Sequence, residues 1–236
     1  RRGIEMVHAQ IERAQQQAGR RLGRRRHAVG MAEVHAAQTD RCDLGRADAA
    51  TLAEYGTPLG LPALRHLLAH RLAERGVEAA PEQIVLTESG TQAIDLVCRF
   101  LLEPGDTVIV DDPCYFNFHA MLRAHRAKVI GAPWTPCGPD LEVFEQRLIE
   151  HSPRLYITNS GPQNPTGAQL SPVVAHRMLK LAERHGVAII EDDIYADLEI
   201  EPAPRLAAFD GLDRVVHIGS FSKTLSAAAR CGFIAA

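Results

Sequence analysis

A lysine follows an apolar run near the end of the sequence. Lys223 closes the segment Gly219-Ser220-Phe221-Ser222-Lys223, directly after residues 215–218. This pattern predicts a buried strand that ends in a tight loop. In one interpretation the lysine reaches back to solvent from the start of a helix. In the other it is a nucleophile, because desolvated surroundings favour the neutral amine that attacks a carbonyl carbon. The Ser-x-x-Lys spacing alone does not decide between them.

Three consecutive acids, residues 191–193, follow a second apolar run at 187–190, and Tyr195 comes shortly after them. Carboxylates this close repel one another in a low-dielectric site, so at least one of them needs a cationic partner. One interpretation is a set of solvent-facing acids with Asp193 capping a helix. The other places Asp192 against a protonated ring nitrogen and lets Tyr195 donate to a ring oxygen, as a pyridine cofactor requires.

The loop at residues 159–167 contains two prolines and two glycines, which fix a specific backbone path. Asn164 precedes Pro165 and is therefore expected to be extended, with an amide free to bind a ligand. A purely structural turn is the alternative.

An anion site is predicted at residues 89–93, which follow another apolar run and open a helix. Ser89 is a candidate cap, Gly90 permits close backbone approach, and Thr91 adds a hydroxyl to the N–H groups of the helix start. A simple helix N-cap is the alternative. Arg230, seven residues after Lys223, could supply a charged clamp for the same anion.

Short apolar runs alternate with helical patterns through most of the chain. Strands are predicted at 84–87, 107–110, 128–131, 154–158, 187–190, 215–218 and 232–235, and helices at 61–75, 91–102, 115–125, 141–150 and 172–185. This alternation predicts an α/β fold: a three-layer αβα sandwich around a mostly parallel, seven-stranded sheet. No helix fits between the last two strands, so the last strand is expected to be antiparallel. The polar segments above all follow strands, at the edge where open α/β sheets bind ligands.

The composition is that of an ordinary globular chain. The net charge of -3 gives no general attraction to nucleic acid or membrane, and no apolar run is long enough to span a bilayer. Five scattered cysteines without a C-x-x-C pair argue against a disulfide framework or a zinc site and fit the cytoplasm.

Residues 1–50 differ from the rest, with eight arginines and two glutamates in the first 30 positions. They are interpreted as a basic, solvated leader; a nucleic-acid-binding arm and an artefactual leader are the alternatives. Residues 51–236 form the predicted cofactor-binding domain. The chain starts with Arg1 and ends within an apolar run, so it is expected to be a fragment.

Six segments in this order resemble fold-type I, class I/II aminotransferases, which use pyridoxal 5'-phosphate (PLP). They most resemble the aminotransferase-like domain of MocR-type bacterial regulators of the GntR superfamily. The segments are residues 54–60, 89–93, 112–115, 163–167, 191–195 and 219–230, and the likeness covers about residues 52–236. Cys114 departs from the pattern, since that motif usually has glycine there.

The resemblance implies a role for each matching residue. Lys223 would form the aldimine with PLP and move the substrate Cα proton, and Asp192 would pair with the ring nitrogen. Tyr195 and Asn164 would bond the ring oxygen, and Tyr115 would stack on the ring. The phosphate would be held by Ser89, Gly90, Thr91, Ser220, Ser222, Arg230 and, from the other subunit of a homodimer, Tyr55.

Three hypotheses follow. The first is amino-group transfer between an amino acid and a 2-oxo acid. The second is an effector-sensing module that binds an amine through PLP and contacts DNA only through a domain absent from this chain. The third is an inactive fragment, because the family binds the substrate carboxylate with an arginine of a small C-terminal domain that this chain lacks.

Overall fold

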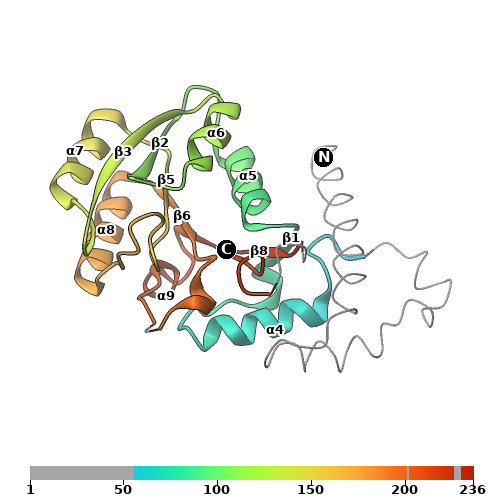
Figure 1. The fold of residues 1–236 in the computed structure, drawn as a ribbon. Helices are drawn as coiled ribbons and strands as arrows, with labels where there is room; N and C mark the ends of the chain where they lie inside the picture. The colour runs from blue at the N-terminus through green and yellow to red at the C-terminus, as the bar shows by residue number, and fades with distance from the viewer. Residues whose placement is uncertain (1–55, 201, 226–229) are drawn as a thin grey trace, which may run out of the picture.

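The computed structural model describes residues 56–200, 202–225 and 230–236. Tyr55 and the predicted leader lie outside this part of the chain. Within the described residues the centre of the fold is one eight-stranded sheet with the order β1-β8-β7-β6-β5-β2-β3-β4 (Figure 1). The strands are β1 (Ile84–Thr87), β2 (Thr107–Asp112), β3 (Lys128–Thr135), β4 (Gly138–Pro139), β5 (Leu155–Thr158), β6 (Ala188–Asp192), β7 (Val215–Ser220) and β8 (Gly232–Ala235).

Helices precede or follow most of these strands. They are α4 (Pro62–Ala73), α5 (Gly90–Leu101), α6 (Asn117–Ala124), α7 (Leu141–His151), α8 (Pro172–His185) and α9 (Leu206–Asp210), with 3-10 turns η1 (Pro81–Gln83) and η2 (Ala196–Leu198). Local signals set their ends. Ser171 caps α8 through the Val174 N–H, and Gly186 ends it in the left-handed conformation. None of the described helices is long and apolar enough to cross a membrane.

The predicted fold class is confirmed. Strands β2, β3, β5, β6 and β7 pair in parallel, whereas β8 runs antiparallel to both β1 and β7, as the missing crossover helix predicted. The sheet has one strand more than the seven expected. The extra strand, β4, is a two-residue antiparallel partner of β3 and contains no apolar run that could have revealed it.

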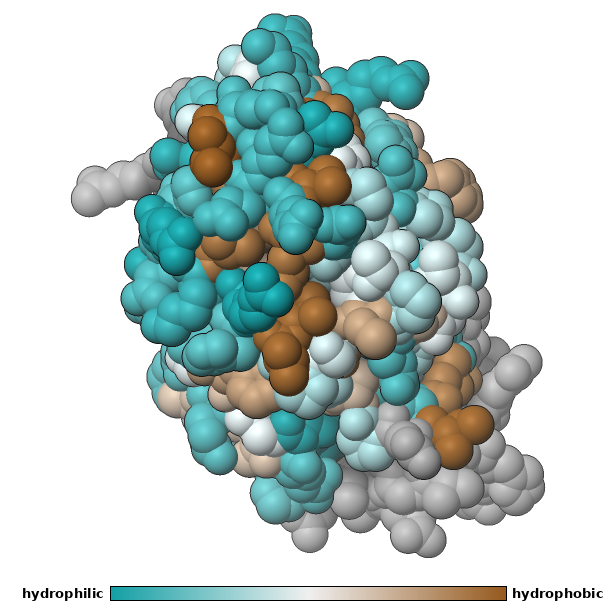
Figure 2. Space-filling view, turned by 90° about the vertical axis from the view of Figure 1, so that its left-hand side faces the viewer, coloured by the Kyte–Doolittle hydropathy of each residue, from teal (hydrophilic) through white to brown (hydrophobic). Residues whose placement is uncertain are grey.

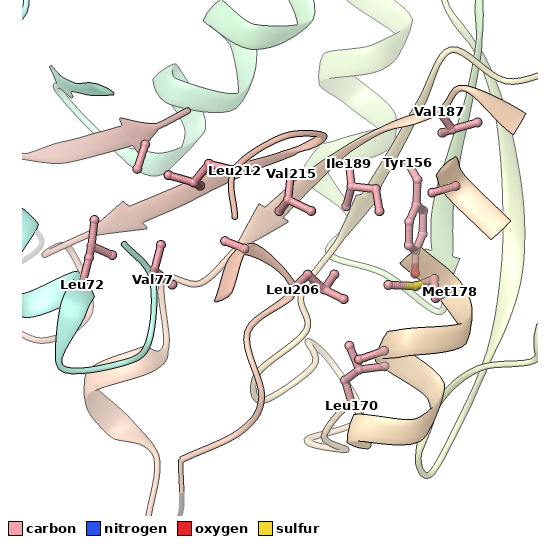
Figure 3. Packing of buried hydrophobic residues seen from close by; sticks show 14 of the residues in the cluster. Leu72, Val77, Tyr156, Leu170, Met178, Val187, Ile189, Leu206, Leu212 and Val215 are labelled. Atoms are coloured by element: carbon pink, nitrogen blue, oxygen red, sulfur yellow. The ribbon is translucent and has the colours of Figure 1, made fainter. Parts of the chain in front are cut away.

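Two hydrophobic cores fill the spaces on either side of the sheet. Helices α5 and α6 pack on one face, against strand residues such as Val110, Ile190 and Ile218. Helices α4, α7, α8 and α9 pack on the other, against residues such as Ile189 and Val215, and Figure 3 shows part of this second core. Successive strand residues therefore point into different cores, as side chains of a pleated strand must.

The outer surface is mostly hydrophilic on the side that carries α7 and α8, with apolar residues in small patches (Figure 2). Two exposed apolar side chains of these helices are Ile149 and Val173. Isolated exposed apolar residues are ordinary on a protein surface.

Candidate functional site

A cavity of about 150 Å³ lies where β6 and β7 end and α5 begins. Its wall contains ten of the residues singled out from the sequence, together with Ile94, Asn117, Phe118, Met121 and Ile194. The ten are Ser89, Gly90, Thr91, Tyr115, Asp192, Tyr195, Ser220, Ser222, Lys223 and Arg230. The chain thus brings four separate segments to one place, at the carboxyl edge of the parallel strands where open α/β sheets bind ligands.

Asp192 is the last residue of β6 and is 3% exposed. Among the described residues its Oδ1 atom has no hydrogen-bond partner. Burial raises the pKa of this carboxyl to about 7, although hydrogen bonds from Asn159 and the Ile194 N–H act in the opposite direction. A buried carboxylate oxygen without a partner is costly. A ligand that presents a positively charged N–H in the cavity would remove this cost.

The start of α5 forms the anion-binding end of the cavity. Ser89 caps the helix through the Gln92 N–H, at 3.1 Å. Gly90 is buried, and a Cβ there would lie 3.0 Å from Ile194. Gly232 of β8 packs behind the turn, where a Cβ would lie 2.5 Å from the Ser89 carbonyl carbon. Two glycines are therefore needed for strand, turn and helix to approach closely. The first N–H groups of a helix have no partner within the helix. At the start of α5 they and the helix dipole suit a phosphate.

The turn after β7 carries Lys223. Ser220 organises the turn, because its Oγ accepts from the Ser222 N–H at 3.2 Å and contacts the Ser222 Oγ at 2.9 Å. Lys223 is exposed, and its Nζ lies 6.0 Å from the centre of the Tyr195 ring. Lysine and tyrosine thus face the same cavity from two consecutive strand ends.

Aromatic side chains form another part of the cavity wall. The Tyr115 ring contacts Phe116 and Phe118 edge to face, with centroid distances of 5.0 and 5.6 Å. The Tyr115 hydroxyl accepts a 2.7 Å hydrogen bond from the Asn117 amide. These contacts hold the ring in one orientation against the cavity. A flat aromatic ligand could stack there.

Asn164 does not line the cavity, but its amide donates to the Tyr195 hydroxyl at 3.3 Å. Its loop is anchored by Gln163, which donates to the Pro113 carbonyl at 2.6 Å. The peptide bonds before Pro113 and Pro165 are both cis. The hydrogen bonds of Gln163 and Asn164 tie this loop to the rest of the site.

Two supporting residues were not assigned a role from the sequence. Buried Asp111 accepts from the Tyr156 and Thr158 hydroxyls, at 2.6 and 3.0 Å, and from the Asn159 N–H. Burial raises its pKa to about 7 against these hydrogen bonds. Asn159 also donates to the Asp192 carbonyl at 2.9 Å. The signal available in the sequence was that Asp111 directly follows the apolar run at 107–110 and Asn159 directly follows the run at 154–158.

Fold and site together define a class of protein. A lysine, a buried carboxylate and a helix N-terminus face one cavity at the carboxyl edge of a mostly parallel, three-layer α/β sheet. This is the arrangement of a domain that binds a phosphorylated, ring-containing cofactor. The family model for aminotransferase class I and II matches residues 23–236, and the chain belongs to this family.

The relatives include both enzymes and regulators. The chain is 34% identical over 178 residues to the probable rhizopine catabolism regulatory protein MocR of Rhizobium meliloti, covering 74% of this chain and 35% of the relative. It is 31% identical over 196 residues to aromatic-amino-acid aminotransferase 1 of Thermococcus litoralis, covering 80% and 47%. The expected likeness to aminotransferases and MocR-type regulators is confirmed.

A solved structure shares the fold over most of the chain. The α-aminoadipate aminotransferase LysN of Thermus thermophilus, complexed with N-(5'-phosphopyridoxyl)-L-leucine, superimposes with a TM-score of 0.73 at 29% identity. The match covers 86% of this chain and 51% of LysN. The chain thus spans about half the length of the relatives it matches, or less.

Proposed function

We propose that the chain binds PLP and carries the cofactor-binding half of an aminotransferase, which moves an amino group between an amino acid and a 2-oxo acid. The observation that carries the proposal is the buried Oδ1 of Asp192, which has no partner in the described part of the chain and lies in a cavity that also contains Lys223. The protonated ring nitrogen of PLP fits this oxygen, because it supplies both the hydrogen and the positive charge.

The other residues have roles that follow from their positions. Lys223 would hold the cofactor covalently, Tyr195 and Asn164 would bond its ring oxygen, and Tyr115 would stack on its ring. The phosphate would be held by Ser89, Gly90, Thr91, Ser220, Ser222 and Arg230. A helix N-terminus with hydroxyl groups and one arginine is well suited to a dianion.

PLP supplies an electron sink for the electrons left at the substrate Cα after deprotonation. The chain supplies proton transfer and orientation. Lys223 Nζ would act as general base at Cα and then as general acid. Asp192 would keep the ring nitrogen protonated, and its burial at 3% exposure keeps competing water away from that contact.

We further propose that residues 51–236 form the PLP-binding domain and residues 1–50 a basic leader. The whole protein would be a cytoplasmic homodimer in which Tyr55 reaches the phosphate of the other subunit. The scattered cysteines, without a C-x-x-C pair, support the cytoplasm.

The sequence contains three lysines, Lys128, Lys180 and Lys223, which makes the covalent attachment easy to locate. The chain would be incubated with PLP, reduced with borohydride and mapped by mass spectrometry. We expect the phosphopyridoxyl group on Lys223, and we expect Lys223→Ala to lose the visible absorbance of the bound cofactor. Lys128→Arg and Lys180→Arg are matched controls, because both lysines are exposed. Equal labelling of all three lysines, or full absorbance in Lys223→Ala, would refute the proposal.

The similarity to the regulator MocR favours a second candidate, an effector-sensing domain. The same cavity would bind PLP and an amine effector without completing transfer. Incubation with a panel of amino acids and 2-oxoglutarate separates the two, since only the first candidate forms glutamate. A winged helix-turn-helix encoded upstream of Arg1 would favour the sensor.

A further inference from the structure

A cluster of buried charges lies on the face of the sheet opposite the cavity. Glu191 and His217 are paired residues of β6 and β7. Each lies two residues after a core residue that Figure 3 labels, Ile189 or Val215, and therefore shares its face of the sheet. Asp192 faces the other way, toward the cavity. The strand thus presents Asp192 to one side and its two acidic neighbours to the other.

This cluster contains three carboxylates and two basic side chains. Arg205 donates to Asp193 at 2.9 Å and to Glu199 at 2.7 Å. His217 contacts Glu191 and Asp193. Each of these side chains is at most 4% exposed, so water screens the charges little.

His217 has a carboxylate oxygen near each ring nitrogen. Nδ1 lies 3.2 Å from Glu191 Oε2 and Nε2 lies 3.7 Å from Asp193 Oδ2. A neutral imidazole would turn a lone pair toward one of these carboxylates, whereas the imidazolium presents a hydrogen to both. Arg205 alone cannot balance three buried carboxylates. The geometry therefore favours the doubly protonated ring.

Glu191 is well satisfied as an anion. It accepts from the Leu206 and Ala207 N–H groups at 2.7 and 3.1 Å, and from the Ser160 hydroxyl. Burial opposes ionisation, but the hydrogen bond and charge of His217 hold the pKa of Glu191 below its ordinary value. For Asp193, burial raises the pKa to about 6 even though His217 and Arg205 act against it.

We propose that His217 is a positioning residue for the cofactor site: as an imidazolium it offsets the charge of the carboxylates on both sides of Asp192 and so favours the ionised form of Asp192. Only the identity of the group that Asp192 binds depends on the proposed function. The effect of His217 on Asp192 does not. The strand register supports it, because Glu191 pairs with His217 and the next pair along the two strands is Asp192 with Ile218. The charges act in the same sense, since Asp193 raises the pKa of Asp192 while His217 lowers it.

Other charged groups surround the two residues. Around Asp192 they are Glu191, Asp193, Arg205, His217 and, in the cavity wall, Lys223 and Arg230. On the other side, a hollow of about 20 Å³ is lined by His217 and by Arg71 of α4, Arg75 of the turn after α4, and Asp197 of η2. Both of these arginines pair with Asp197, and they are 24% and 29% exposed, so solvent screens them more than it screens the buried cluster.

The test measures Asp192 directly in the chain without cofactor. Carboxyl ¹³C NMR with labelled aspartate follows its titration, and Asp192→Asn identifies the resonance. We expect a midpoint near pH 7 in the wild type. In His217→Gln the midpoint should rise by about one pH unit, because a nearby positive charge is lost.

A double variant separates charge from packing. In His217→Gln/Asp193→Asn one negative charge is removed together with the positive charge, so the midpoint should return toward that of the wild type. If His217 only supported packing, the midpoint of Asp192 in the double variant would stay as far from the wild-type value as in His217→Gln. An unchanged midpoint in folded His217→Gln, or no reversal in the double variant, would overturn the proposal.

One measurement uses only the wild-type chain, so it does not depend on whether a variant folds. Imidazole ¹⁵N NMR of the wild type at neutral pH should show hydrogen on both nitrogens of His217, and a single protonated nitrogen contradicts the proposal. Neither titration requires PLP. A wild-type chain that fails to bind PLP would therefore overturn the proposed function while the NMR results still decide the role of His217.

Discussion

Asp192 is predicted to reduce the stability of the chain in the absence of cofactor. The side chain is 3% exposed, and its Oδ1 has no hydrogen-bond partner among the residues that the structure describes. Replacement by asparagine keeps the shape and removes the charge. We expect Asp192→Asn to be more stable than the wild type at pH 8, although it should bind PLP worse.

The magnitude follows from the pKa. Burial raises the pKa of Asp192 from its ordinary 3.8 to about 7. At about 1.4 kcal/mol for each pH unit, this corresponds to roughly 4 kcal/mol. Between the two values the folded chain keeps a proton that the unfolded chain releases, so stability falls as pH rises from about 4 to about 7. The penalty is complete above pH 7 and absent below about pH 4.

Urea unfolding followed by circular dichroism at pH 5, 6, 7 and 8 would measure this. The free energy of unfolding of Asp192→Asn should exceed that of the wild type by an amount that grows with pH and levels off above pH 7. Asp213→Asn is the control, since this side chain is 75% exposed and should change little. Added PLP should stabilise the wild type more than Asp192→Asn.

A difference between the two proteins that stays constant with pH would refute this reasoning. So would a less stable Asp192→Asn at pH 8, because it would mean that the carboxylate already has a protein partner. Either result would also remove the main support for a cationic ring nitrogen at this position.

Two further predictions concern packing. Gly232→Ala should destabilise the fold and weaken PLP binding, because a Cβ there would lie 2.5 Å from the Ser89 carbonyl carbon and 2.8 Å from Gly90 N; thermal unfolding and PLP titration test this. Met178→Ala should cost about 2–5 kcal/mol, since the side chain is fully buried in the core of Figure 3. Denaturant unfolding would measure the cost, with the exposed Val173→Ala as a control that should change stability by less than about 0.5 kcal/mol.

The sequence predicted elements well where hydrophobicity defines them. The bounds of β1, β8 and α8 agree with the prediction to the residue. Strands β2, β3, β6 and β7 run longer than predicted, because backbone pairing continues past the apolar run, whereas β5 begins one residue later than predicted. In β2 and β3 the ladder extends to Asp112 and Pro133. A polar side chain and a proline are both more typical of loops, so the sequence contains no sign that the strands continue there. Short elements such as α9 were missed, since five residues show no helical period.

The site was predictable to the extent that its residues are unusual for their positions. Glycine, serine, lysine and acids at strand ends stand out against apolar runs, and ten of the residues chosen from the sequence do line the cavity. The apolar wall, including Ile94, Phe118 and Met121, could not be separated from the core, because these residue types are the same in both places. Only the folded chain distinguishes them.

The three consecutive acids at the end of β6 and just after it have different surroundings. Because neighbouring carboxylates repel one another, the sequence predicted that at least one of the three needs a cationic partner. Strand geometry divides them: Glu191 and Asp193 turn to the face where His217 and Arg205 neutralise them. Asp192 turns to the cavity, where its Oδ1 finds no hydrogen bond from the described part of the chain. The fold provides cations for both outer acids and leaves the middle one facing a cavity, and this arrangement is the basis for proposing that Asp192 binds a cation that arrives with the ligand.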